Sequence, residues 1–420
     1  IKEVKKEDEN SVTRRRLTYM EEKKERKMRD SGIPWIGEVT EGWEFSKIKY
    51  HCTMKSGDNI TALDISDNGE YPVYGGNGLR GFYKIYNKNG NHILIGRQGA
   101  LAGNVHLVNG KFWATDHAVI VTLKNDVFIN YFFRMLESMN LNQYAFDTAA
   151  QPGLSVSRIM NLNIVLPNLK EQHRIADFLG SKCSEIDTLI EHLRARMESA
   201  KEYKKAVITE AVTKGLDKDA KMKDSGVEWI GEIPDGWKVV RFKHIASIKS
   251  NLVQPDKYMK YPQIAPDNIE KDTGRLLSHQ TVEESGVISG NHLFYRGQIL
   301  YSKIRPNLNK LTVAPFDGLC SADMYPIESK LPTLFMVYSM LSTYFVSQVS
   351  LIIQDRVKMP KINQEELGEI KVAVPSQQEM LTIADYLDSK CSEIDALLQN
   401  YEYQIATLEE YKNCLLYTSD

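Results

Sequence analysis

The sequence predicts an α+β protein built as two similar domains separated by two long antiparallel helices that pair as a coiled coil. Three observations predict this fold: an internal repeat, short strand-like runs inside each copy, and a seven-residue apolar period at the end of each copy. The chain of 420 residues is also longer than a typical single core, so two domains are expected.

The repeat opens with a shared motif near the start of each copy. MRDSGIPWIGEVTEGW begins at Met28 and recurs as MKDSGVEWIGEIPDGW from Met222, an offset of 194 positions. Such self-similarity is the signature of a duplicated architecture. The motif contains the pairs Trp35/Trp229 and Trp43/Trp237. Because both copies keep them, we interpret these tryptophans as hydrophobic anchors that lock each domain onto the helices, in preference to base-stacking side chains.

A second shared motif closes each copy. IADFLGSKCSEIDTLI from Ile175 recurs as IADYLDSKCSEIDALL from Ile383, with twelve of sixteen positions identical at an offset of 208. The second copy therefore carries 208 − 194 = 14 extra residues between its two shared motifs. The scaffold is common to the two copies, whereas their middles differ.

The divergent middles read as α+β domains. Short β-branched runs such as His92–Ile95, Ala118–Leu123 and Gln298–Ser302 are broken by Gly, Asn and Pro, which is typical of strands and turns. Helical stretches are expected at Phe128–Ser138 and Thr333–Gln348.

Each copy ends in a long helix with a coiled-coil seam. The stretch from about Lys170 to Thr213 lacks proline, and its apolar residues recur every seven positions, as they do after Ile383. A helix of this length spans roughly 60 Å. Two copies of one seam most simply pack on each other, and an antiparallel pair would place the domains at opposite ends with pseudo-twofold symmetry. The predicted seam residues are Leu179, Cys183, Ile186, Ile190, Leu193, Met197, Leu387, Cys391, Ile394, Leu398, Ile405 and Leu408.

These patterns divide the chain into five segments. They are a charged leader at 1–27, a first domain at 28–165, a first helix at 166–215, a second domain at 216–373 and a second helix at 374–420. The leader falls outside the repeat, and the final residues YTSD depart from it. We therefore expect a non-native leader, with a true start at Met20 or Met28, and a truncated second helix.

Composition excludes several classes of protein. Hydrophobic residues make up 42% and charged residues 26%, as in ordinary globular proteins. No apolar run approaches the roughly 18 residues of a membrane span, and no signal peptide is apparent, so a cytoplasmic location without membrane contact is expected. The five cysteines are scattered without a CxxC spacing, which argues against a disulfide framework or a zinc cluster.

The charge balance does not by itself indicate a nucleic-acid binder. The net charge is −2, whereas free-standing DNA binders usually carry a basic excess. The distribution is uneven, with 16 Lys and Arg against 11 Asp and Glu in residues 238–365 and 8 of each in residues 58–158. If the chain binds DNA, a partner is expected to supply part of the positive surface.

Taken in order, these pieces resemble the specificity subunit of type I restriction-modification enzymes over nearly the whole chain. The resemblance is carried by SGIPWIGEVTEGW, YPVYGGNGLRGFY, ILIGRQGALAGNV, QPGLSVSRIMNLNIVLP and the helix starting EQHRIADFLGSKCSEID. It implies that each middle is a target-recognition domain for one half of a bipartite, asymmetric site in double-stranded DNA. It also implies that the helices dock two methyltransferase subunits, which bring S-adenosylmethionine, while restriction/translocase subunits complete the complex. This chain itself would hold no cofactor, no metal and no catalytic residue.

The candidate DNA-binding residues cluster in turns of the two middles. Arg97 and Gln98 have side chains suited to guanine and adenine edges, and the basic stretch 303–310 is suited to phosphate. For any one of these residues an ordinary solvated role is at least as well supported. The candidates are Asn77, Arg80, Arg97, Gln98, Thr115, His117, Lys303, Arg305, Asn307, Lys310, Arg356 and Lys358, with Asn309 in the same stretch.

Enzymatic interpretations find little support. Gly76–Gly81 fits the pattern GxGxxG, but the sequence after it is strand-like and rich in turns, whereas a dinucleotide-binding site needs a helix there. Two other interpretations of these glycines remain, a flexible loop that faces DNA and a plain tight turn. Asp116 and His117 are expected on opposite faces of a strand and so are poorly placed as a dyad. No adenine-methyltransferase motif or Walker A loop occurs. The principal alternative to a DNA-specificity subunit is a coiled-coil adaptor whose duplicated domains bind proteins.

Overall fold

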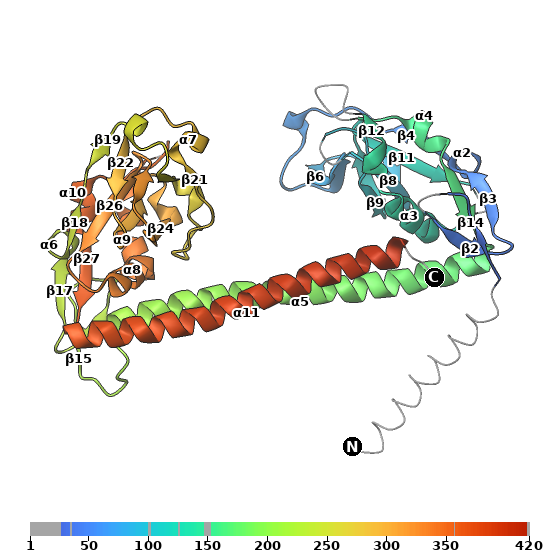
Figure 1. The fold of residues 1–420 in the computed structure, drawn as a ribbon. Coiled ribbons are helices and arrows are strands. Elements are labelled where there is room, and N and C mark those ends of the chain that lie inside the picture. The colour runs from blue at the N-terminus through green and yellow to red at the C-terminus, as the bar shows by residue number, and fades with distance from the viewer. Residues whose placement is uncertain are drawn as a thin grey trace, which may run out of the picture. The chain divides into compact units, whose positions relative to one another are not determined.

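The fold is taken from a computed structural model of the chain. It describes residues 27–33, 36–99, 102–124, 127–146, 153–356 and 358–417. Of the expected leader at 1–27 only Lys27 falls inside these ranges, and Trp35 lies outside them. Two compact units are formed, 1–192 with 404–420 and 193–403, so the helices at the end of each copy contribute to both (Figure 1).

Unit 1 contains two four-stranded sheets. One has the strand order β4-β11-β8-β9 and the other β6-β5-β10-β7. The β1–β2 hairpin and the pair β3–β14 lie before and after these sheets in the chain. The elements are β1 Met28–Asp30, β2 Glu38–Thr40, β3 Glu44–Lys47, α2 Ile48–His51, β4 Cys52–Ser56, η1 Ala62–Asp64, β5 Tyr71–Gly75, β6 Gly78–Tyr83, β7 Lys88–Asn89, β8 His92–Gly96, β9 Val105–Val108, β10 Lys111–Ala114, β11 Ala118–Leu123, α3 Ile129–Ser138, η2 Leu141–Tyr144, β12 Ala145–Phe146, β13 Gly153–Leu154, α4 Val156–Met160 and β14 Asn163–Leu166.

Unit 2 contains a four-stranded and a five-stranded sheet. Their strand orders are β18-β26-β23-β24 and β19-β22-β25-β20-β21, with β15–β16 and β17–β27 as separate pairs. The elements are β15 Met222–Asp224, β16 Glu232–Pro234, β17 Lys238–Arg241, α6 Phe242–Ile245, β18 Ala246–Ile248, β19 Leu252–Val253, η3 Pro255–Lys257, β20 Pro262–Ile264, η4 Pro266–Asn268, β21 Gln280–Thr281, α7 Val282–Ser285, β22 Asn291–Phe294, β23 Ile299–Ser302, η5 Pro306–Leu308, β24 Leu311–Val313, β25 Gly318–Cys320, β26 Met324–Ser329, α8 Thr333–Leu341, α9 Thr343–Ile353, α10 Gln364–Glu369 and β27 Lys371–Val374.

The two units share one topology, as the sequence repeat predicts. The first sheets match strand for strand, β4-β11-β8-β9 with β18-β26-β23-β24. In the second sheets the pair β5 and β10 is parallel, and so is the equivalent pair β20 and β25. Each parallel pair is flanked by antiparallel partners, β6 and β7 in unit 1 and β21 and β22 in unit 2. The divergent middles therefore keep a common fold beneath their different sequences.

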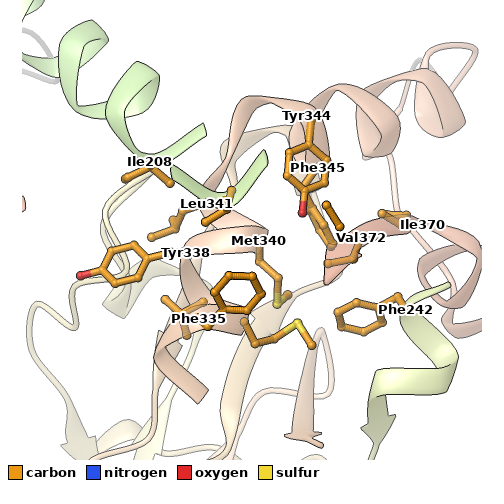
Figure 2. Close-up of a cluster of buried hydrophobic side chains, with 14 of the residues drawn as sticks. Ile208, Phe242, Phe335, Tyr338, Met340, Leu341, Tyr344, Phe345, Ile370 and Val372 are labelled. Atoms are coloured by element: carbon orange, nitrogen blue, oxygen red, sulfur yellow. The ribbon is translucent and has the colours of Figure 1, made fainter. Parts of the chain in front are cut away.

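Each unit has its own apolar core. In unit 1 the strands β8 and β11 are almost wholly buried, and α3 covers them with Phe132 and Leu136, which are fully buried. In unit 2 the largest cluster joins α8 and α9 to residues of α5, including Ile208 (Figure 2). Burial of these apolar side chains supplies the main stabilising term in each unit.

The helix expected at 333–348 is broken into two. α8 ends at Leu341 and α9 starts at Thr343, because Ser342 has extended backbone (φ −67°, ψ 152°). The Thr343 N–H at the start of α9 is accepted by the hydroxyl of Thr209 from α5, at 2.9 Å, so a tertiary contact satisfies the new helix end. Within the described residues no single helix has the length and apolarity to cross a membrane; α8 and α9, bent by 58°, pass that test only as a pair.

The long helices are α5, Leu169–Lys214, and α11, Gln377–Tyr417. Their seam residues Leu179, Cys183, Ile186, Ile190, Leu193, Leu387, Cys391 and Ile394 are buried, and Met197, Leu398, Ile405 and Leu408 are half-buried. In unit 2, Lys204 binds Asp395, whereas Gly215, just after the end of α5, lies near Glu379, earlier in α11. The helices are therefore antiparallel there.

Candidate nucleic-acid interface

A short turn at residues 97–99 follows β8 in unit 1. The Arg97 N–H donates to the carbonyl of His117 at 2.9 Å, and the Leu154 N–H donates to the carbonyl of Arg97 at 2.9 Å. Gln98 forms an isolated bridge with Gly153. Backbone bonds on two sides thus fix the turn independently of its side chains. The Arg97 and Gln98 side chains are exposed, and the Arg97 guanidinium donates to the Ser56 hydroxyl at 3.2 Å.

The β5–β6 hairpin packs its tip against this turn. Gly75 pairs with Gly78, which leaves Gly76 and Asn77 as the hairpin loop. A Cβ added at Gly76 would lie 3.1 Å from the Gln98 carbonyl oxygen and 3.3 Å from that of His117, so the approach favours glycine. Because an antiparallel strand follows the glycines in place of a helix, GxGxxG here is a hairpin turn and not a dinucleotide-binding motif.

The unit 1 candidates differ in exposure. Asn77 and Arg80 are exposed, His117 is half-exposed, and Thr115 is fully buried. The prediction that Asp116 and His117 lie in a strand was wrong, because both lie in a turn between β10 and β11. The His117 Nε2 is 3.9 Å from the Asp116 carboxylate.

The turn after β23 in unit 2 repeats the backbone arrangement of the turn after β8. The Lys303 N–H donates to the Asp323 carbonyl at 2.9 Å, and the Ile362 N–H donates to the Lys303 carbonyl at 3.0 Å. Ile304 bridges Lys361. The equivalent positions of the two units, with the unit 1 residue first, are Arg97 and Lys303, Gln98 and Ile304, His117 and Asp323, and Gly153 and Lys361. One backbone frame therefore presents different side chains in the two units.

The remaining unit 2 candidates fall into two groups. Lys310 and Arg356 already have partners: the Lys310 ammonium donates to the Pro266 carbonyl at 2.8 Å, and the Arg356 guanidinium binds Glu366 through both nitrogens. This contact lowers the pKa of Glu366. Arg305, Asn307 and Lys358 are exposed, Lys303 is half-buried with its ammonium 5.5 Å from the Tyr325 ring, and Asn309 is buried.

Three residues of this region were missed by sequence reasoning. Lys361 lies beside the unit 2 turn, and its ammonium donates to the Asp323 carboxylate at 3.1 Å. The Ser56 hydroxyl accepts a hydrogen bond from the Arg97 guanidinium. The His106 ring lies so close to Gly78 that a Cβ added there would be 3.3 Å from it. Burial lowers the pKa of His106. Each lies dozens of residues from its partners in the sequence, so local patterns carry no signal for it. An alignment of the two middles could have paired Lys361 with Gly153.

The described residues contain no group of three or more His, Cys, Asp or Glu side chains that could hold a metal ion. The seam cysteines are small buried residues without thiolate character: burial raises the pKa of Cys391 to about 11 and raises that of Cys183 as well.

Comparison with known proteins finds similarity to one family. A model of the type I restriction modification DNA specificity domain matches residues 40–198. The chain is 34% identical over 267 residues to the EcoDI specificity subunit of Escherichia coli, covering 59% of this chain and 60% of that protein. It is 26% identical over 416 residues to the MjaVIII specificity subunit of Methanocaldococcus jannaschii, covering 90% and 92%. Residues 40–198 therefore match a type I restriction modification DNA specificity domain, and the chain is similar to type I specificity subunits over a larger part of its length.

The extent of these likenesses differs. The matched part spans 60% of the EcoDI subunit and 38% of the Escherichia coli EcoprrI subunit, to which it is 41% identical over 152 residues. A chain from a solved type I restriction-modification system, studied for its assembly and conformational transition, aligns with a TM-score of 0.63 at 15% identity, over 90% of this chain and 97% of that one. That likeness concerns the fold.

The repeated tryptophans join the shared hairpins to the helices. The Trp43 indole donates to Glu171 of α5 at 3.1 Å, and the Trp237 indole donates to Glu379 of α11 at 3.0 Å. Trp237 is buried in the unit 2 core, which agrees with an anchoring role, whereas Trp229 is 43% exposed. Both acceptors lie in the first turn of their helix, where a carboxylate also interacts favourably with the helix dipole.

Each unit also presents an exposed apolar face on its part of the helices. Unit 1 holds Phe178, Leu189 and Tyr411, and unit 2 holds their counterparts at an offset of 208, Tyr386, Leu397 and Tyr203; all are at least 41% exposed. In unit 2 Tyr203 and Tyr386 lie near Lys390, and in unit 1 Tyr411 lies near Lys182, the equivalent lysine. The two faces are therefore built from matching residues.

Proposed function

We propose that this chain is a type I restriction-modification specificity subunit that binds double-stranded DNA at a bipartite, asymmetric sequence, with one half-site contacted by each unit. The observation that carries the proposal is the common frame at the turns 97–99 and 303–305. Identical backbone bonds support Arg97 and Gln98 in one unit and Lys303 and Ile304 in the other. A fixed frame with exchanged side chains suits a protein that recognises two different sequences with one fold.

The weak net charge of −2 is compatible with this role. Arginine and lysine at the two turns supply local positive charge, and phosphate contacts position a protein on DNA without specifying sequence. Thr115 is omitted from the proposed contact surface because its side chain is buried, and Lys310 and Arg356 are assigned to structure because they already bind Pro266 and Glu366. The partner subunits would supply further positive surface.

The proposed partners are two methyltransferase subunits, one on each apolar face, with restriction/translocase subunits completing the complex. The two faces are built from equivalent residues, so one kind of protein surface can cover either of them. Two matching faces therefore favour two copies of the same partner. S-adenosylmethionine would bind to the methyltransferases, and this chain would act without catalysis. A place in the cytoplasm, with access to chromosomal DNA, belongs to the same proposal.

The deciding experiment is to co-express the chain with the modification subunit of its own operon in methylation-free cells and to map N6-methyladenine across the genome. A gapped motif with two unlike halves, absent when this chain is omitted, is expected. No new methylation from a co-purifying complex would contradict the proposal and favour a protein-binding adaptor.

The docking faces can be tested separately. Leu189→Ser and Leu397→Ser alter matching exposed residues, so each single variant should lose one methyltransferase copy and the double variant both, as read by native mass spectrometry. Tyr50→Ser, at a 58% exposed site outside both faces, is the control and should keep full assembly. Complete assembly in the double variant would rule out these faces.

A further inference from the structure

The third position of the common turn has a left-handed backbone in both units. In unit 1 this position is Gly99, with φ +91°. In unit 2 it is Arg305, with φ +42° and ψ +53°. Glycine enters this region without steric cost, whereas an L-residue with a Cβ is disfavoured there. Pro306 follows Arg305, and a residue before proline normally takes extended backbone.

Nothing in the backbone of the turn requires a side chain at Arg305. Its N–H donates to the Pro360 carbonyl at 2.8 Å, and its own carbonyl accepts from Leu308 at 2.9 Å, which glycine would do equally well. The side chain is exposed, and across the described ranges no carboxylate lies within ion-pair distance of its guanidinium. Met359, next to Pro360, also has positive φ (+47°), so disfavoured backbone is concentrated at this turn. Backbone held in such regions clusters at functional sites.

Resting on the proposed function, we propose that Arg305 contacts DNA in the second half-site. Unit 1 fills the equivalent position with the residue that the backbone favours, and unit 2 retains an arginine there against that preference. The guanidinium offers five donors in a planar fork, which match the O6 and N7 acceptors of guanine or the oxygens of a phosphate. Lys303 lies on the same frame, two residues before Arg305, and would hold a nearby phosphate.

The test uses the complex of the full chain with its modification subunit, and a DNA duplex carrying the motif that the wild-type complex methylates. Arg305→Gly should leave the thermal stability of the chain unchanged or raise it, because glycine relieves the backbone. It should weaken DNA binding or relax the preference at one base by roughly 5- to 150-fold, the range for a single contact. Arg305→Lys keeps the positive charge but loses the planar pair of donors. If Arg305 contacts phosphate, this variant should largely retain binding; if Arg305 contacts guanine, it should lose the base preference.

Asp272→Gly is the matched control. Asp272 lies in the same unit with φ +62°, so the change also relieves left-handed backbone, although it removes the ion pair of Asp272 with Lys205 at 3.6 Å as well. We expect DNA binding and the methylated motif to stay as in the wild type. If Arg305→Gly leaves affinity, its salt dependence and the methylated motif all unchanged, Arg305 does not contact DNA and the inference is overturned. Failure of the wild-type complex to methylate any motif would instead overturn the proposed function.

Discussion

Glu366 illustrates how a single ion pair ties stability to pH. Its carboxylate binds Arg356, and it also accepts from the Asn363 N–H in a capping box at the start of α10. The hydrogen bond from Arg356 lowers the pKa of Glu366 from its ordinary value of 4.5. A lowered folded-state pKa contributes stability above the unfolded value, and this contribution is lost as the pH falls through the folded pKa.

We therefore expect Glu366→Gln to lower the free energy of unfolding by a constant amount above about pH 4.5, with the difference from wild type shrinking at lower pH. Urea unfolding at a series of pH values measures this. Glu365→Gln, an exposed neighbour, is the control. A wild-type-to-variant difference that stays the same from pH 7 down to pH 3 would show that the ion pair does not contribute as described.

Thr115 is the candidate DNA-binding residue that the structure buries most completely. Its hydroxyl is inaccessible, and within the described part of the chain it has no hydrogen-bond partner, while its backbone bonds Tyr74 and Ala118. Thr115→Val should raise the free energy of unfolding by up to about 1 kcal/mol, because it removes an unsatisfied buried polar group at constant shape. The methylated motif should not change. A changed base preference would mean that the hydroxyl reaches the DNA.

At the scale of elements, two inter-helix ion pairs repeat between α5 and α11. Lys204 binds both oxygens of Asp395 at 2.7 Å in unit 2, and Lys412 binds both oxygens of Asp187 at 2.7 and 2.9 Å in unit 1. Lys412 is Lys204 shifted by 208 positions, and Asp395 is Asp187 shifted by the same number. The pairs differ in burial, since the lysine side chain is 11% exposed in the first and 24% exposed in the second.

Lys204→Met should destabilise unit 2 by about 1 kcal/mol, because it leaves Asp395 without its partner while keeping the apolar stem. Lys412→Met should cost less, since that pair is better screened by water. Thermal unfolding at low and at 1 M salt measures both effects, and salt should reduce the difference for the more exposed pair more strongly. Equal losses at the two sites would contradict the role assigned to burial.

Most elements were predictable because they follow from local patterns. The run 118–123 became β11 with the expected bounds, and the helix expected from about Lys170 to Thr213 is α5, Leu169–Lys214. The prediction of one continuous helix at 333–348 was wrong at Ser342, because neither proline nor glycine indicates a break there. The contact of Thr343 with Thr209, 134 residues away, supports the break, and sequence periodicity cannot reveal such a contact.

For the whole molecule, two compact units with separate cores imply two unfolding transitions. Trp43→Phe removes an indole bond to Glu171 in unit 1, and Trp237→Phe removes the bond to Glu379 in unit 2. Each should lower the melting temperature of one transition in calorimetry. The loss should be about 2 kcal/mol at the buried Trp237 and smaller at the half-buried Trp43. A single transition that both variants shift equally would contradict independent units.

The sequence by itself determined the duplication, the α+β class, the long helices and their seams, because repeats and apolar periods are properties of the chain read in order. Only the tertiary structure decided which turns meet. Arg97 reaches His117 and Leu154, and Arg305 reaches Pro360, through backbone bonds between residues far apart in the sequence. The same holds for the equivalence of Gly99 and Arg305, which is a matter of backbone conformation. Contacts between distant residues and backbone angles depend on how the strands are packed, and no local pattern encodes that packing.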